Sequence, residues 1–208
     1  MTTAVTVYGK MRIPTEAHKG LIDHAANIAK NVGGKLNVTL SGSDQPLTPK
    51  QKETHASNVF GQKVTVKPHS TLVTHLSDLS NSGVKHLHLV AGSDRAEEYQ
   101  NLINRYNNKP DKAGKVAFSF DTVHVHQYGE ERQEAKSLPR HPSKIKNITK
   151  YTSASRVEKY AKRGDYDAFK AFYRNTPDQH VKKIYNDIRS AKESSFLGFR
   201  QWLIEQLL

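Results

Sequence analysis

The first two thirds of the chain alternate between short apolar runs and stretches in which apolar residues recur every three or four positions. Such alternation predicts strands and helices in turn. The predicted strands cover residues 3–8, 36–40, 63–67, 86–91 and 116–126, and the helices cover 21–29, a segment that starts at Thr48-Pro49, 72–79 and 95–106. We expect Ser93 or Asp94 to cap the helix at 95–106. Strands that alternate with helices favour a Rossmann-like α/β doubly wound parallel sheet of about five strands.

The last third of the sequence has a different pattern. Residues 130–150 are polar and contain Pro139 and Pro142, which predicts an excursion over the surface. Beyond it, helices are predicted near 155–163, 166–173, 178–192 and 195–208. We therefore expect a Rossmann-like domain over residues 1–175 and a helical C-terminal extension over 176–208. The final helix is too apolar for a free tail, so it should pack on the parent domain or on another subunit.

The composition of the chain limits both its expected location and the kinds of partner that it can attract. The chain has no cysteine, which excludes disulfides and thiolate metal sites, and it has neither a signal-like start nor an apolar run long enough to span a membrane. These features predict a soluble, cytoplasmic protein. The formal net charge is +12, and residues 140–208 alone carry 15 Lys or Arg against 7 Asp or Glu. Polyanions, either nucleotide phosphates or nucleic acid bound by the basic C-terminal third, are the partners that such a charge attracts.

The segment after the first predicted strand is suited to binding phosphate. It runs Gly9-Lys10-Met11-Arg12-Ile13-Pro14-Thr15-Glu16-Ala17-His18 and leads directly into an amphipathic helix. In an open parallel sheet, ligands bind beyond the carboxyl ends of the strands. The amide end of the helix and the cations of this segment would act together on an anion there.

This segment resembles the signature of the HxGH-type nucleotidyltransferases, the superfamily of cytidylyltransferases and of the pantetheine-phosphate and nicotinamide-nucleotide adenylyltransferases, and is closest to phage-encoded members. The positions that match the family pattern are Gly9, Lys10, Met11, Pro14, Thr15, His18, Leu21 and Ile22. Thr15 takes the place of the first histidine. Ala17 replaces the glycine that lets backbone approach phosphate closely, and Arg12-Ile13 replaces the usual Asn-Pro.

Three further segments resemble family motifs and come in the expected order. Residues 46–52, with the sequence PLTPKQK, resemble the loop and helix start after the second strand, and residues 90–95, VAGSDR, resemble the turn after the fourth strand. Residues 152–158, TSASRVE, resemble the helix start that holds the triphosphate. Glu158 stands there at a position that is usually basic, where a carboxylate would repel a triphosphate.

The resemblance implies a reaction and a set of roles. A phosphorylated small-molecule acceptor would attack the α-phosphorus of a nucleoside triphosphate, and pyrophosphate would leave. His18, Thr15, Lys10 and Arg156 would be the catalytic residues. The nucleotide would be bound by Gly9, Met11, Gly92, Asp94, Arg95, Ser153 and Ser155. Mg²⁺ would be the cofactor and would be held through the nucleotide phosphates.

Two alternatives to a fully active enzyme stay open. Ala17 and Glu158 would also suit a weakened or inactive homologue that serves as a structural or DNA-associated protein of a phage head, with the C-terminal helix as a virion contact and a location in the host cytoplasm or the virion. A protein that only binds nucleic acid, through cations such as Lys182, Lys183 and Arg200, would not require the ordered phosphate motifs.

Histidines lie in pairs on two of the predicted strands. His86 and His88, and His124 and His126, are two residues apart, so each pair points to one face of its strand. Such pairs can chelate a metal, but no third ligand is in view. We assign no metal to them.

Overall fold

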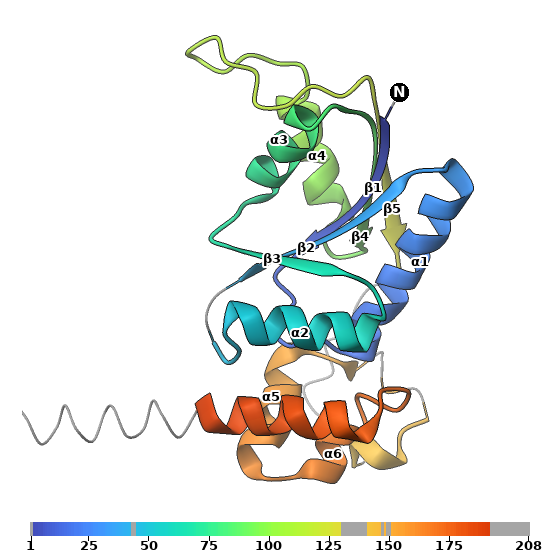
Figure 1. Cartoon of the computed structure of the whole chain (residues 1–208), viewed down its shortest axis with the longest axis vertical. Coiled ribbons are helices and arrows are strands. Elements are labelled where there is room, and N and C mark those ends of the chain that lie inside the picture. Colours follow the sequence, from blue (N-terminus) through green and yellow to red (C-terminus); the bar gives the residue numbers. More distant parts are fainter. Residues whose placement is uncertain (1, 43–44, 130–140, 147, 149–150, 192–208) are drawn as a thin grey trace, which may run out of the picture.

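Five parallel strands form one sheet in the order β3-β2-β1-β4-β5 (Figure 1). The structure is a computed structural model that describes residues 2–42, 45–129, 141–146, 148 and 151–191. The strands are β1 (Thr2–Gly9), β2 (Lys35–Gly42), β3 (Val64–Pro68), β4 (Val84–Gly92) and β5 (Thr122–Tyr128). Every neighbouring pair is parallel. The predicted fold class, a Rossmann-like doubly wound α/β sheet, is confirmed.

Helices cover both faces of the sheet (Figure 1). Helices α1 (Glu16–Val32) and α2 (Pro49–Phe60) pack on one face, and α3 (Leu72–Asn81) and α4 (Ala96–Tyr106) pack on the other. A further layer beside α2 contains α5 (Ala154–Arg163), α6 (Tyr166–Lys170) and a helix over residues 178–191, and a short 3-10 helix covers Pro142–Lys144. Val157, Phe169 and Ile184 of this layer share one hydrophobic core with α1 and α2. The layer therefore has no separate core of its own.

Local capping explains where several helices begin and end. The Thr48 hydroxyl accepts a hydrogen bond from the Gln51 amide at 3.3 Å, and the Gln51 side chain accepts one from the Thr48 amide at 3.0 Å, so the predicted start of α2 at Thr48-Pro49 is confirmed. Gly33 ends α1 in the left-handed conformation, with φ of 61°. The expected cap of α4 by Ser93 or Asp94 is wrong. The Arg95 amide bonds the Gly92 carbonyl in a turn, and Arg95 is the N-cap.

Two predicted boundaries differ from the structure. The strand predicted over 116–126 begins only at Thr122, since the Asn107 side chain bonds both the amide and the carbonyl of Phe120. The helix predicted over 166–173 ends at Lys170. Phe172 and Tyr173 are nevertheless buried in the core.

The remaining predictions for the last third are tested only in part. Of the excursion predicted over 130–150, residues 130–140, 147 and 149–150 lie outside the described residues, and Pro142 and Ile148 are buried rather than on the surface. The helix predicted over 195–208 also lies outside them. The division into domains at residue 175 stays a prediction. Along the chain that the structure describes, no helix has the length and apolar character needed to cross a membrane.

His75 of α3 is a neutral histidine in the core. Its side chain is buried, its ring stacks on Tyr8, and its Nε2 lies 2.8 Å from the Thr6 hydroxyl. That hydroxyl donates to the Asn37 carbonyl, so Nε2 must carry the hydrogen and donate to Thr6. Burial, and to a smaller extent the nearby Lys67, lowers the pKa of His75 to about 4.

The fold should therefore lose stability in mild acid. The unfolded chain takes up a proton at His75 below its ordinary pKa of 6.5, whereas the folded chain does so only near 4, so the free energy of unfolding falls as pH falls through this window. Between about pH 7.5 and about pH 5, denaturant titrations should show a drop that is smaller by about 2 kcal/mol in His75→Gln than in the parent chain. An equal drop in both chains would contradict this assignment. His69→Asn is the control, since His69 is exposed at a φ of 58° that asparagine tolerates.

Candidate functional site

A large pocket opens where the sheet reverses its winding, at the carboxyl ends of β1 and β4. The two strands are neighbours, but β1 leads into α1 on one face and β4 leads into α4 on the other. The chain segments that leave them diverge, which creates a crevice at this point of a doubly wound sheet. The pocket has a volume of about 940 Å³, within the usual range for a small-molecule site.

The amino-terminal ends of four helices meet at this pocket. Glu16 and Ala17 of α1, Leu72 of α3 and Ala154 of α5 line it, and so does Arg95, the N-cap of α4. Each helix start presents backbone amides without partners inside the helix, together with the positive end of the helix dipole. Four such ends around one cavity favour an anionic ligand with several charged groups.

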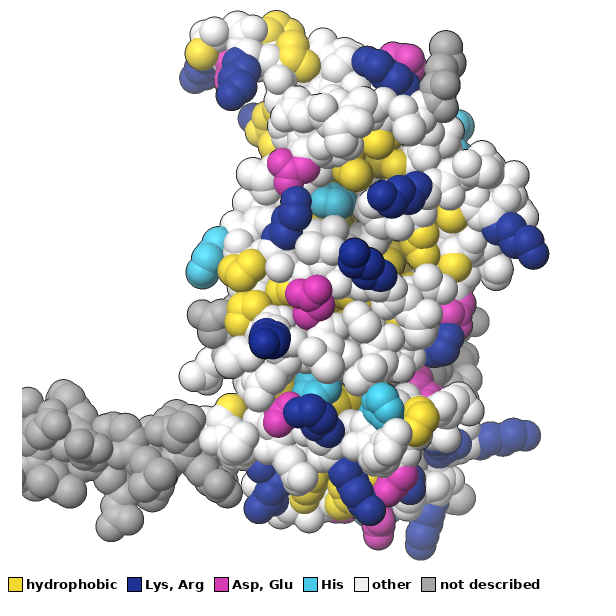
Figure 2. Space-filling view, in the orientation of Figure 1, with side chains coloured by type: hydrophobic (Ala, Val, Ile, Leu, Met, Phe, Trp, Pro, Cys, Tyr) yellow, Lys and Arg dark blue, Asp and Glu magenta, His cyan; other side chains and the backbone are white. Residues whose placement is uncertain are grey.

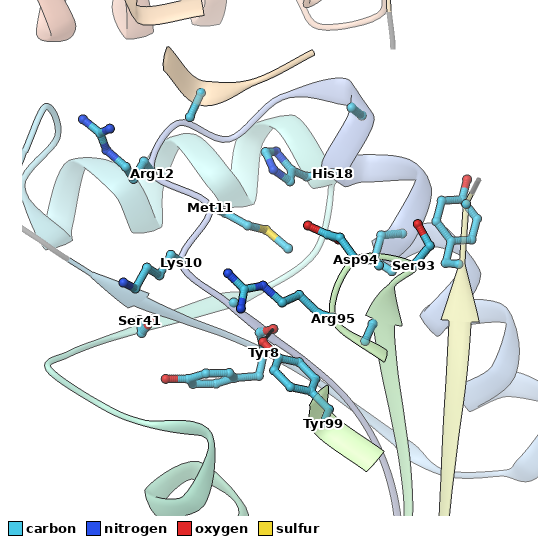
Figure 3. A pocket seen from close by; sticks show the side chains of 18 of the residues that line it. Tyr8, Lys10, Met11, Arg12, His18, Ser41, Ser93, Asp94, Arg95 and Tyr99 are labelled. Atoms are coloured by element: carbon cyan, nitrogen blue, oxygen red, sulfur yellow. Dashed lines mark hydrogen bonds between the residues drawn. The ribbon is translucent and has the colours of Figure 1, made fainter. Parts of the chain in front are cut away.

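Basic side chains add to this field. Lys10, Arg12 and Arg95 line the pocket, and Arg95 extends across it towards Lys10 (Figure 3). The pocket also holds acids, but they are bound by neighbours. Glu98 pairs with Arg95 at 2.5 Å, and Glu16 accepts hydrogen bonds from Asn175 and Thr176. Asp94 is a further acid in the lining, so cationic and acidic side chains are balanced there and the positive field comes from the helix amino ends.

His18 is held in one orientation by its own helix start. Its Nδ1 accepts a hydrogen bond from the backbone amide of Thr15 at 3.2 Å and lies 2.9 Å from the Thr15 hydroxyl. A backbone amide is always a donor, so Nδ1 carries the lone pair and the hydrogen of the neutral ring is on Nε2. The ring lies at the pocket wall above Met11 (Figure 3), so that Nε2–H can serve as a donor to a bound anion.

The turn after β1 has an unusual backbone. Met11 has a φ of 33°, in the left-handed region that side-chain-bearing residues adopt rarely. Such conformations persist only where the surrounding structure enforces them, and they gather at functional sites. This turn lies at the centre of the site, with the Met11 side chain in the pocket (Figure 3).

The two ends of the pocket differ in chemistry. One end is lined by Gly20, Gly92, Ser93 and Tyr128, and a Cβ on Gly20 would lie 2.5 Å from the Tyr128 hydroxyl, so a larger residue at position 20 would displace the Tyr128 side chain. The other end is lined by Tyr8, Ser70, Tyr99 and Leu102. There the Tyr8 hydroxyl donates to the Ser70 carbonyl at 2.6 Å, and burial raises the pKa of Tyr99 to about 12, so Tyr99 stays neutral.

Most of the residues proposed from the sequence meet in this pocket. It is lined by Gly9, Lys10, Met11, His18, Gly92, Asp94, Arg95 and Ser153. Three proposed residues do not line it. Thr15 is fully buried behind His18, Ser155 lies further along α5, and the Arg156 guanidinium donates to the Tyr151 carbonyl. Sequence reasoning missed Tyr8 and Tyr99, although the position of Tyr8 beside Gly9 at the end of the first strand was a usable signal.

Glu158 lies outside the residues that line the pocket. Its carboxylate pairs with Arg12 at 3.0 Å and with Lys162 at 2.5 Å, and its side chain is only 12% exposed. The repulsion of a triphosphate expected from its place in the motif is therefore offset by two cations. Instead, the pair with Arg12 joins the turn after β1 to α5.

The paired histidines form a stack on β4 and β5. His88 Nδ1 lies 2.9 Å from His126 Nε2, and the His88 ring stacks on both His124 and His126. Burial and the neighbouring imidazoles lower the pKa of His88 and of His126. Over the described residues, no group of three or more histidines or acids has a geometry that could hold a metal ion.

The His18 geometry gives a direct spectroscopic prediction. Nitrogen-15 correlation spectra of the histidine rings at neutral pH should show His18 with hydrogen on Nε2 and a bare Nδ1, because Thr15 donates to Nδ1. Hydrogen on Nδ1 would contradict the geometry. His18→Ala identifies the resonance.

Comparisons with known proteins do not identify a family for this chain. No family model and no curated protein matches this sequence. A search of solved structures found the crystal structure of an intact type IV self-sufficient cytochrome P450 monooxygenase, with 17% identity and a TM-score of 0.31. The match covers 69% of this chain and 16% of that one, so the chain corresponds to a small part of that protein. A likeness of this size carries no argument about function.

Proposed function

We propose that the pocket binds a nucleoside triphosphate and that the protein transfers its nucleotidyl group to a phosphorylated small-molecule acceptor, with release of pyrophosphate. The observation that carries the proposal is the convergence of four helix amino ends with Lys10, Arg95 and His18 on one pocket. Segments far apart in the sequence, 9–18, 92–95 and 152–154, supply these side chains and three of the four helix starts, and each of them resembles a nucleotidyltransferase motif.

The proposed reaction needs charge stabilisation more than covalent chemistry. An acceptor phosphate oxygen forms a bond to the α-phosphorus while the bond from that phosphorus to the pyrophosphate oxygen breaks, and the electron pair of the broken bond leaves with pyrophosphate. His18 would donate a hydrogen bond through Nε2, and Lys10 and Arg95 would neutralise oxygens of the phosphates. Thr15 acts through His18 as a positioning residue. Mg²⁺ would be carried by the phosphates themselves and would lower their charge.

The two ends of the pocket would give the two substrates separate places. The end at Gly92, Ser93 and Tyr128 would take the base and ribose, as the resemblance of the 90–95 turn implies. The end at Tyr8 and Tyr99 would take the acceptor, whose phosphate would reach Lys10 and the amino end of α3. The α-phosphorus would then lie between them, near His18.

A catalytically weakened or inactive homologue with a structural or DNA-associated role in a phage particle is the second candidate. Ala17, which lines the pocket where the motif has glycine, and the net charge of +12 favour it. On the face seen in Figure 2, the cations of the described residues are scattered among acids and not gathered into one stripe. A role that needs only a basic surface would not explain why the segments that resemble phosphate-binding motifs line one cavity.

Nucleotide binding is the first test. Thermal unfolding should be measured with ATP, CTP, GTP and UTP, each with Mg²⁺, because a ligand that binds the native state raises its stability by mass action. At least one nucleotide at about 100 times its Kd should raise the free energy of unfolding by about 2.7 kcal/mol. If none of the four raises the midpoint while double-stranded DNA does, the enzyme proposal fails and the structural candidate replaces it.

His18 provides the test of transfer. With the nucleotide that binds best and a panel of phosphomonoesters as acceptors, His18→Ala should cut pyrophosphate release by roughly tenfold or more, as expected for loss of a charge-stabilising donor. The fold should survive, since the ring is at the pocket wall. His124→Ala is the control, because His124 is exposed on β5 and does not line the pocket. Equal turnover in the two variants would remove His18 from the mechanism.

A further inference from the structure

Lys52 is a buried lysine directly behind the wall of the pocket. Its side chain, in the first turns of α2, is only 1% exposed. The amine Nζ donates to the Lys10 carbonyl at 3.1 Å and to the Ser41 carbonyl at 3.3 Å. Both Lys10 and Ser41 line the pocket, at the carboxyl ends of β1 and β2. One amine therefore joins two strand ends that form the site.

Burying a lysine at this position is unfavourable in free energy. Lysine is almost never fully buried, and moving its charge out of water is unfavourable. The first turn of α2 has no acidic residue, so the positive end of the helix dipole opposes a cation there. An apolar side chain would fill the same space without these penalties. The specific contribution of Lys52 is its hydrogen bonding to the two carbonyls.

The backbone around Lys52 is arranged to keep the amine in place. A Cβ on Gly42 would lie 3.2 Å from Nζ, so glycine leaves the room that the amine occupies. The capping pair of Thr48 and Gln51 fixes the start of α2 and hence the direction in which Lys52 enters the core. These two features belong to different segments, β2 and the loop before α2, and both act on the same side chain.

Holding the Lys10 carbonyl has a geometric consequence for the pocket. In a trans peptide, the carbonyl of one residue and the amide of the next point in opposite directions. With the Lys10 carbonyl turned towards Lys52, the Met11 amide must point the other way, away from the buried amine. Met11 has the left-handed φ of 33° at this point, a conformation that needs support from outside the turn.

We propose that Lys52 is a positioning residue for the anion pocket: its amine fixes the turn over residues 9–12 so that the backbone amide of Met11 and the side chain of Lys10 face bound phosphate. The part that concerns phosphate rests on the proposed function. The part that concerns the turn does not, because it can be measured without any ligand. Lys52 itself lies behind the pocket wall and does not touch the ligand.

The test compares Lys52→Met with Lys50→Met, which removes an exposed lysine from the same turn of α2. Two quantities are measured on the whole chain: amide hydrogen exchange of the peptide that covers residues 9–12 without ligand, and the affinity for Mg²⁺-pyrophosphate by titration calorimetry. Lys52→Met should speed exchange and weaken the affinity, each by about tenfold, as for loss of a buried hydrogen bond. Lys50→Met should leave the exchange unchanged and weaken the affinity by about twofold or less, as for an exposed charge.

Gly42→Ala keeps the test decisive if Lys52→Met fails to fold. The added methyl pushes on Nζ without removing it, and it should change both quantities in the same direction. If Lys52→Met unfolds and Gly42→Ala leaves the exchange unchanged, Lys52 is merely structural and the proposal is overturned. Faster exchange in either variant without a change in the affinity for Mg²⁺-pyrophosphate would overturn it as well. If the parent chain binds no pyrophosphate, the proposed function fails, while the exchange measurement alone still decides whether Lys52 fixes the turn.

Discussion

The site depends on the reversal of winding between β1 and β4. These two strands are hydrogen-bonded neighbours, yet their following helices lie on opposite faces of the sheet. The backbone must therefore separate at their carboxyl ends, and the amino ends of α1 and α4 open onto the same space. The starts of α3 and α5 complete the ring. Positive potential arises here from chain topology before any charged side chain is considered.

Polar contacts connect this edge of the sheet to the rest of the molecule. His55 of α2 lies 2.7 Å from Asp187 in the 178–191 helix, and burial lowers the pKa of His55. Arg12 reaches Glu158 of α5, and Lys52 reaches the backbone at Lys10. The first two contacts tie the helical layer to α2 and to the turn after β1, and the third ties α2 to that turn, so the geometry of the pocket and the packing of the helical layer are linked. Apolar packing alone would allow these segments more freedom.

The spacing of apolar residues, together with the residues that begin and end helices, was sufficient to predict the sheet and most of its helices. The capping signal at Thr48 and the stop at Gly33 act locally, and local signals can be read from a sequence. The true start of β5 was missed because it depends on Asn107, which is distant in the sequence and takes the backbone partners of Phe120. Strand order likewise depends on pairings between distant segments.

The site was predictable where a motif supplies the residue and unpredictable where geometry decides. The motif segments place Lys10, His18 and Ser153 in one pocket, as proposed. The motif could not show that Arg156 turns back to the Tyr151 carbonyl, or that Glu158 is neutralised by Arg12 and Lys162. It also gave no sign that Lys52 would be buried, since the sequence around it reads as an exposed helix start.

We propose that backbone amides at the helix starts, together with nearby cations, form an anion site at the carboxyl ends of β1 and β4. The most direct measurement is a nuclear magnetic resonance titration of the nitrogen-15-labelled chain with Mg²⁺-pyrophosphate. The largest amide shifts should fall on residues 9–12, on Ala17 and His18 at the start of α1, and on Ala154 at the start of α5. Shifts confined to the lysines of α5, α6 and the 178–191 helix, with none at the strand ends, would contradict it.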